Sequence, residues 1–134
     1  AWDISGIDAI IMPPMASPAL PHGTFTHTAL AASYSFLWNV VDWPAGVIPV
    51  TKVDPERDMM PPSMRPGKAL DQAANPLQSN RTVEAELAYC YNPERMAGLP
   101  VGVQVITPRF CEAQCLFAMQ VLEDALKTAS NSNQ

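Results

Sequence analysis

Serine and lysine side chains could together supply nucleophilic catalysis, in which a hydroxyl attacks a substrate while a neighbouring base accepts its proton. The three lysines fall at a predicted strand end, in a loop and at a helix end. A reactive serine needs an adjacent base held in packed surroundings, and none of the serines lies in a glycine-rich turn that would provide them. The sequence therefore predicts no catalytic residue in this chain. The residues considered are Ser5, Ser17, Ser33, Ser35, Ser63, Ser79, Lys52, Lys68 and Lys127.

Histidine and cysteine side chains could instead bind a metal or carry protons. Cys111 and Cys115 are one helical turn apart, but a zinc site needs about four ligands, and no further candidate lies near them in the sequence. We interpret both as thiols of a helix that faces the core, and we expect neither a metal nor a cofactor. His22 and His27 flank the start of a predicted helix. Because no nucleophile is recognisable beside them, we expect no catalytic role for either.

Asn39 and Asp42 are polar residues among apolar neighbours. Burial of such side chains is costly unless they are hydrogen-bonded, so we expect each to pair with backbone groups at a turn from helix to strand. Their predicted role is structural, and substrate contact is the alternative.

Three apolar runs predict strands, over residues 7–12, 45–50 and 100–106. The first ends at two prolines, which lack backbone donors, and the third alternates valine with other residues, as expected for one well-packed face. A helix lies between the first two, and this order favours a parallel pair joined by a right-handed crossover. Gly102 is expected to leave room for a close neighbour.

The first predicted helix begins at Thr24 or Thr26, either of which can cap it, and ends near Val41 because Pro44 restricts the residue before it. It carries two apolar stripes, which leave little surface for water and predict a position between two layers. One stripe is Leu30, Tyr34, Leu37 and Val41, and the other is Ala29, Ala32, Phe36 and Val40.

The last predicted helix begins near Cys111 or Glu112 and frays over residues 128–134. Its predicted buried stripe comprises Cys115, Ala118, Met119, Leu122 and Leu126. Prolines interrupt residues 51–97, where methionines alternate with charged residues. We interpret this stretch as a Pro/Met-rich loop excursion, with a short helix over 82–89, from a single domain that spans residues 1–134. Such a loop is either a freely varying insertion or a functional segment.

The charge distribution argues against a nucleic acid partner. The net charge is −5, and the basic residues are scattered, whereas phosphate binding needs clustered Lys and Arg. No apolar run reaches the roughly 20 residues of a membrane span, and no signal-peptide pattern is recognisable. Three cysteines without a secretion signal favour a reducing compartment, so we expect an intracellular protein.

Two runs of the chain resemble the C-terminal third of the amidase signature family. They are Asn39-Val-Val-Asp-Trp-Pro-Ala-Gly-Val-Ile-Pro-Val50 and Gly98-Leu-Pro-Val-Gly-Val-Gln-Val-Ile106. The first is most similar to the fatty acid amide hydrolase subgroup. The resemblance implies an α/β fold, namely the C-terminal portion of a three-layer α/β/α amidase domain with a central mixed sheet.

In that family the chemistry is carried by a lysine, a bridging serine and a nucleophilic serine that lie N-terminal to this region. The resemblance therefore implies a fragment, inactive alone, of a serine amidohydrolase that cleaves carboxamides, with fatty acid amides as the favoured substrates. It also implies that Ala29, Ala32 and Phe36 line the channel that holds the acyl chain. The alternative for these three residues is packing on a neighbouring helix.

Other functions stay open at this stage. The chain could belong to a small-amide hydrolase or a tRNA-linked amidotransferase subunit of the same family, or be a non-catalytic interaction fragment. The apolar stripe argues against a small polar substrate. The resemblance implies a small-molecule lipid amide as partner, and it leaves open a homodimer and association with internal membranes through regions outside this chain.

Overall fold

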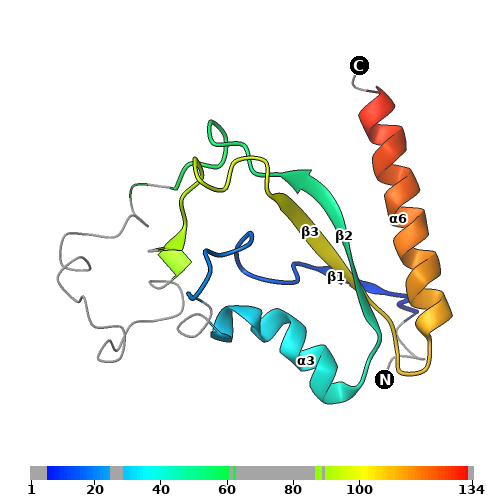
Figure 1. Cartoon of the computed structure of the whole chain (residues 1–134). Helices are drawn as coiled ribbons and strands as arrows, with labels where there is room; N and C mark the ends of the chain where they lie inside the picture. The colour runs from blue at the N-terminus through cyan, green and yellow to red at the C-terminus, as the bar shows by residue number, and fades with distance from the viewer. Residues whose placement is uncertain (1–5, 25–28, 61, 63–86, 89, 133–134) are drawn as a thin grey trace. The chain divides into compact units, whose positions relative to one another are not determined.

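The computed structural model describes residues 6–24, 29–60, 62, 87–88 and 90–132 (Figure 1). Its residue contacts divide the chain into two compact units. One comprises Ala1–Pro14, Tyr34–Thr51 and Val101–Gln134, and the other comprises Met15–Ser33 and Lys52–Pro100. The elements in chain order are β1 (Ile10–Met12), a 3-10 helix η1 (Ala29–Ala32), α3 (Ser33–Val41), β2 (Ala45–Lys52), β3 (Pro100–Ile106) and α6 (Glu112–Ser132).

The three strands form one sheet in the order β1-β3-β2. β1 is antiparallel to β3. β2 is antiparallel to β3 as well, because the Thr107 amide donates to the Pro44 carbonyl before β2 and the Gly98 amide donates to the Val53 carbonyl after it. β1 and β2 therefore run in the same direction, but β3 lies between them. The predicted direct pairing of these two strands is wrong, since the chain order of a strand-helix-strand unit does not reveal a later strand that inserts between them.

Some element bounds agree with those predicted and others differ. β3 and the end of α3 at Val41 are confirmed, whereas β2 continues to Lys52 and β1 is shorter than expected. Residues 25–28, where the first helix was predicted to begin, lie outside the described residues. Of the helix predicted over 82–89, only Leu87 and Ala88 are described, and both are helical. The loop excursion over 51–97 and the single domain stay predictions.

The predicted fraying of residues 128–132 is wrong, because α6 continues to Ser132. Three hydroxyls of its last turns donate to the carbonyl one turn back: Thr128 to Asp124, Ser130 to Leu126 and Ser132 to Thr128. Through such local bonds, serine and threonine hydroxyls inside a helix find an acceptor in the helix backbone itself.

Within the first unit, α3 and α6 lie on opposite sides of the sheet (Figure 1). The Cys115 thiol of α6 donates to the Val105 carbonyl of β3 at 3.3 Å. The predicted inward stripe is confirmed: Cys115 is buried, the other four members are half-buried, and the polar residues between them are exposed. A Cβ at Gly46 would overlap the Met119 sulfur, so this glycine lets α6 approach β2.

Among the described residues, the longest buried run is the second half of β3 together with the residue that follows it. Gln104, Val105, Ile106 and Thr107 are all at most 2% exposed. Consecutive burial means that both faces of the strand are covered there. Residues 101–103 are all half-buried, so the predicted alternation with a single packed face is wrong for β3. Gly102 has the predicted close neighbour, because a Cβ at this position would lie 3.0 Å from the Ile48 carbonyl oxygen.

Candidate functional site

The three predicted substrate-binding residues lie on two consecutive helical elements. Ala29 and Ala32 are half-buried in η1, where the three-residue repeat of a 3-10 helix stacks positions i and i+3 on one side. Phe36 lies in α3 and is 45% exposed. Their contact with a substrate stays a prediction.

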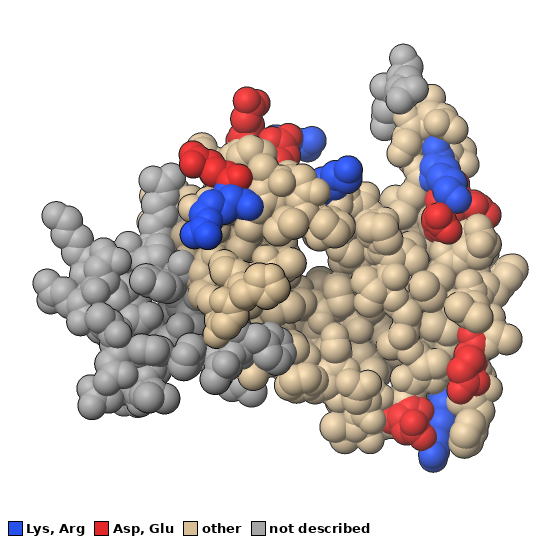
Figure 2. Space-filling model, viewed as in Figure 1, with Lys and Arg blue, Asp and Glu red and all other residues tan. Residues whose placement is uncertain are grey.

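α3 presents an uncharged and largely apolar surface. It has no buried residue, and Val40 is 82% exposed. Tyr34, Leu37 and Val41 are also exposed, and Figure 2 shows no charged side chain over this helix. The predicted burial of this helix between two layers is therefore not met within the described part of the chain.

The C-terminus of α3 has the hydrogen bonds of a Schellman motif. The Trp43 amide donates to the Trp38 carbonyl at 3.0 Å, and the Asp42 amide donates to the Asn39 carbonyl at 3.3 Å. The rings of Trp38 and Trp43 stack with centroids 5.8 Å apart, which supplies the apolar contact that accompanies this motif. Asp42 occupies the left-handed position, with φ of 57°, where glycine is usual.

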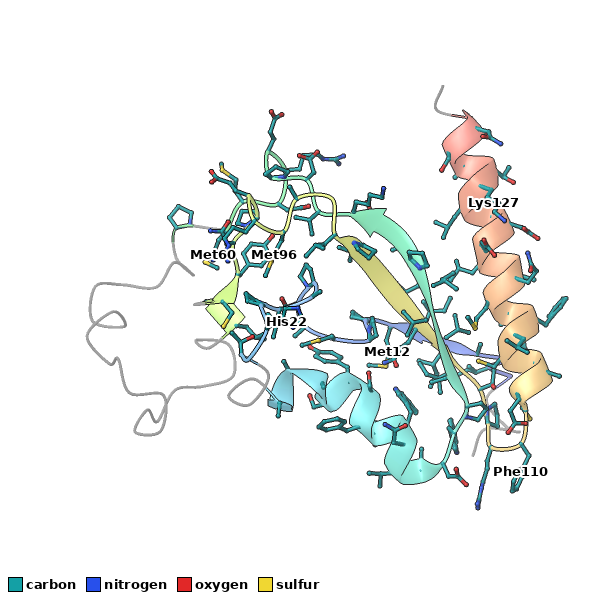
Figure 3. The ribbon with its side chains drawn as sticks, viewed as in Figure 1. Met12, His22, Met60, Met96, Phe110 and Lys127 are labelled. Carbon is teal, nitrogen blue, oxygen red and sulfur yellow. The ribbon has the colours of Figure 1, made fainter. Side chains whose placement is uncertain are left out.

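The Asp42 side chain is exposed and forms an ion pair with Arg109, with a distance of 2.5 Å between Oδ2 and Nη2. The Arg109 guanidinium also lies 4.7 Å from the centroid of the Phe110 ring. Phe110 has φ of 65°, and Figure 3 shows it pointing away from the turn between β3 and α6. The predicted burial and backbone pairing of Asn39 and Asp42 are wrong, since both side chains are exposed and the backbone of this turn bonds to itself.

Gln104 has a role that the sequence pattern did not predict. Its Nε2 donates to the Pro13 carbonyl at 3.1 Å and to the Tyr34 carbonyl at 2.9 Å. The Ser35 hydroxyl donates to the Pro14 carbonyl at 2.6 Å. Together these bonds join β3, the chain after β1 and the first turn of α3. The available signal was a long amide in a strand of otherwise apolar residues, which must find partners if it is buried.

Several of the described residues with acid-base or nucleophilic groups make structural contacts. The Ser17 hydroxyl donates to the Pro18 carbonyl, and Lys127 pairs with Glu123 on α6. Burial, and then the nearby Asp58 carboxylate, raise the pKa of the Tyr91 phenol, whose hydroxyl donates to the Asp58 carbonyl at 2.6 Å. This tyrosine is therefore protonated near neutral pH.

The other candidates can be placed only in part. His22 is exposed. In the described ranges, His, Cys, Asp and Glu side chains form no group of three or more that could hold a metal ion. None of the helices described here is long and apolar enough to cross a membrane. Ser5, Ser63, Ser79, Lys68 and His27 lie outside the described residues.

The chain is similar to proteins of a known family. The Amidase family model matches residues 2–116. An acetamidase of Aspergillus oryzae (strain ATCC 42149 / RIB 40) is 34% identical over 110 residues, which are 82% of this chain and 17% of that protein. Fatty-acid amide hydrolase 1 of Sus scrofa is 30% identical over 124 residues, which are 91% of this chain and 19% of that protein.

A solved structure of a fatty acid amide hydrolase has the same fold, with a TM-score of 0.65 at 23% identity over 92% of this chain and 20% of that one. This likeness confirms the α/β class, of which the chain forms a small part. The chain spans about a fifth of the length of the relatives it matches. Because the family match runs from the start of the sheet into α6 and agrees with the fold, the chain belongs to the amidase family.

Proposed function

We propose that this chain is part of a serine amidohydrolase, and that the complete enzyme cleaves carboxamides with fatty acid amides as the favoured substrates. Membership of the amidase family supports amide hydrolysis. The observation that supports a lipid substrate is the exposed, uncharged surface of α3, where Phe36 and Val40 lie one turn apart.

An apolar helix surface favours a hydrocarbon ligand for a simple physical reason. Each methylene that leaves water contributes roughly 0.8 kcal/mol, so an acyl chain lying along α3 would gain affinity with its length. A small polar amide would gain nothing from such a surface. We propose that Ala29, Ala32 and Phe36 form part of this acyl channel, with the alanines leaving it wide and Phe36 as its bulky wall.

The chain would contribute the sheet core and this channel wall, while residues outside it carry the chemistry. The family resemblance implies that a serine attacks the amide carbonyl, a second serine relays a proton from a lysine, and backbone amides stabilise the oxyanion. A serine-directed fluorophosphonate is then expected to inactivate the complete enzyme by labelling a residue outside 1–134.

Hydrolysis of small amides is the second candidate, and the similarity to an acetamidase favours it. The relatives thus differ in the size of the amide that their names state. Substrate length is therefore the property to measure.

The test replaces Ala32 by Trp in the complete enzyme and measures kcat/KM for a long-chain and a short amide. We expect the ratio of long to short to fall about tenfold, which corresponds to ~1.4 kcal/mol of transition-state binding. The added ring would fill the channel without touching the reacting groups. Ser33→Trp is the matched control, because it adds the same ring at the adjacent, exposed position.

If these three residues pack on a neighbouring helix instead of lining a channel, Ala32→Trp would give another result. Overpacking a core costs roughly 1–3 kcal/mol of stability and lowers activity on every substrate alike. An unchanged ratio accompanied by a large loss of melting temperature would withdraw Ala29, Ala32 and Phe36 from the channel.

A further inference from the structure

The amide of Gln104 is buried and connects distant parts of the chain. This residue lies opposite Met12 in the sheet and is only 2% exposed. Its Nε2 reaches the carbonyls of Pro13 and Tyr34, which are 91 and 70 residues away in the chain. One side chain therefore ties together the sheet, the chain after β1 and the start of α3.

The chemistry of the two partners selects an amide at this position. Both partners are backbone carbonyl oxygens, which accept hydrogen bonds and cannot donate them. The amide group of glutamine offers two donors from one atom, whereas a carboxylate offers none and would face the two carbonyls with like partial charge. A thioether or alkyl side chain would leave both acceptors without this partner.

The hydroxyl of Ser35 strengthens the same connection by donating to the Pro14 carbonyl at 2.6 Å. Three hydrogen bonds thus connect this region: Ser35 of α3 bonds to Pro14, and Gln104 of β3 bonds both to Pro13 and to Tyr34 in the first turn of α3. None of α3's own residues is buried, so these polar contacts act where apolar burial is small.

We infer that Gln104 is a positioning residue, which fixes the first turn of α3 and so sets where the α3 surface stands relative to the sheet. The inference rests on the proposed function in one respect, namely that this surface meets the acyl chain of the substrate. A helix displaced by about 1 Å can cost an enzyme up to 10²-fold in rate through misplacement alone.

The test is Gln104→Glu in the complete enzyme, with melting temperature and the long-to-short ratio of kcat/KM measured across pH. A buried carboxyl that faces two carbonyls has its pKa raised, because its charged form loses solvation and meets only acceptors. The folded variant then holds a proton that the unfolded chain releases, so its stability falls as pH rises above about 4.3, the ordinary value for Glu.

The elements around residue 104 carry few other titratable groups, so the titration of the introduced carboxyl can be measured. β1, α3 and β3 contain no Asp, Glu, His, Lys or Arg, and Tyr34 is the titratable side chain that α3 contributes. The protonated variant regains one of the two donors. We therefore expect the long-to-short ratio of Gln104→Glu to lie between about 10- and 100-fold below that of the parent at neutral pH and to recover partly in acid.

Gln114→Glu is the matched control. The Gln114 Nε2 also donates to a carbonyl, that of Asp8 at 2.9 Å, but in an exposed bond that water can replace. We expect this variant to keep the parent's ratio and pH dependence. If Gln104→Glu does not fold, Ser35→Ala removes the neighbouring bond to Pro14, and we expect it to lower the ratio in the same direction.

The outcomes separate this inference from the proposed function. A lower melting temperature for Gln104→Glu with an unchanged ratio would make Gln104 a packing residue and overturn the inference. If Ala32→Trp lowers the ratio and Gln104→Glu does not, the channel stands and the positioning role fails. If Gln104→Glu lowers the ratio and Ala32→Trp does not, the positioning role stands and Ala32 leaves the channel.

Discussion

The second half of β3 and the helix α3 belong to the same compact unit but differ in how they are held. From Gln104 to Ile106, every residue of β3 is buried, as is Thr107 after it; β3 has neighbouring strands on both sides and α6 against it. α3 has no buried residue and exposes apolar side chains along its length. Burial therefore stabilises the strand, whereas hydrogen bonds at its two ends hold the helix.

The two ends of α3 use different contacts. At its start, Gln104 and Ser35 donate to carbonyls of the first turn and of the chain after β1. At its end, the Schellman bonds close the helix and Asp42 pairs with Arg109. An apolar helix that is fixed at both ends and exposed between them is suited to contact a ligand or another part of the protein.

The largest difference between the two regions is expected from truncating one apolar side chain in each. Ile106→Ala removes a side chain that is 0% exposed and should cost about 2–5 kcal/mol of unfolding free energy, through lost burial and a cavity. Phe36→Ala should cost less than ~1 kcal/mol if α3 faces the channel, while lowering activity on long-chain amides. Urea unfolding of the complete protein measures both costs. Similar losses for the two variants would mean that α3 is packed in the protein, and would remove the contrast.

Two glycines of the sheet should respond differently to the same added methyl group. At Gly102, a Cβ would lie 2.9 Å from Val47 Cγ1 and 3.0 Å from the Ile48 carbonyl oxygen, so Gly102→Ala should destabilise by about 1–3 kcal/mol because backbone must move. At Gly46 the obstacle is the flexible thioether of Met119, which can change rotamer. We expect Gly46→Ala to lower the melting temperature less. The reverse order would show that the contact of α6 with β2 is tighter than that between the strands.

The sequence predicts some features of the fold and not others. Periodicity and proline positions predict β3, the end of α3 and the inward stripe of α6, because these features depend on local pattern and on burial against any neighbour. The strand order depends on which distant segments meet, and no local pattern contains that information. The α/β class followed from the resemblance of the two valine-rich runs, and the fold comparison confirms it.

The candidate site was less predictable than the fold. The importance of Gln104 arises from carbonyls 70 and 91 residues away, which only the folded chain brings together. Asp42 was expected to bond to backbone, but the Schellman motif satisfies its own backbone groups and leaves the carboxylate to Arg109. Spacing alone does not distinguish a polar side chain that hydrogen-bonds to the backbone of its own turn from one that pairs with a side chain of a neighbouring turn.

The smallest expected effect concerns Asp42, at the end of α3. A residue with a Cβ in the left-handed region costs roughly 1–2 kcal/mol relative to glycine, although glycine returns about 0.5–1 kcal/mol of that as backbone entropy. The ion pair with Arg109 joins side chains that are 70% and 55% exposed, so it contributes only about 0–1 kcal/mol. We therefore expect Asp42→Gly to change the unfolding free energy by less than ~1 kcal/mol, and Asp42→Ala, which keeps the strain and loses the ion pair, to be the less stable of the two.

Salt separates the two contributions at this position. Counterions screen an exposed ion pair, with a Debye length near 10 Å at 0.1 M and 3 Å at 1 M, whereas backbone strain does not depend on ionic strength. The stability of Asp42→Gly relative to the parent should thus increase with salt, as measured by melting temperatures in parallel series. If Asp42→Gly is instead less stable than Asp42→Ala at every salt concentration, the backbone strain at φ of 57° does not decide the stability of this turn. Glycine flexibility would then loosen the end of α3, and this end of the helix would depend on a stiff turn more than on the carboxylate.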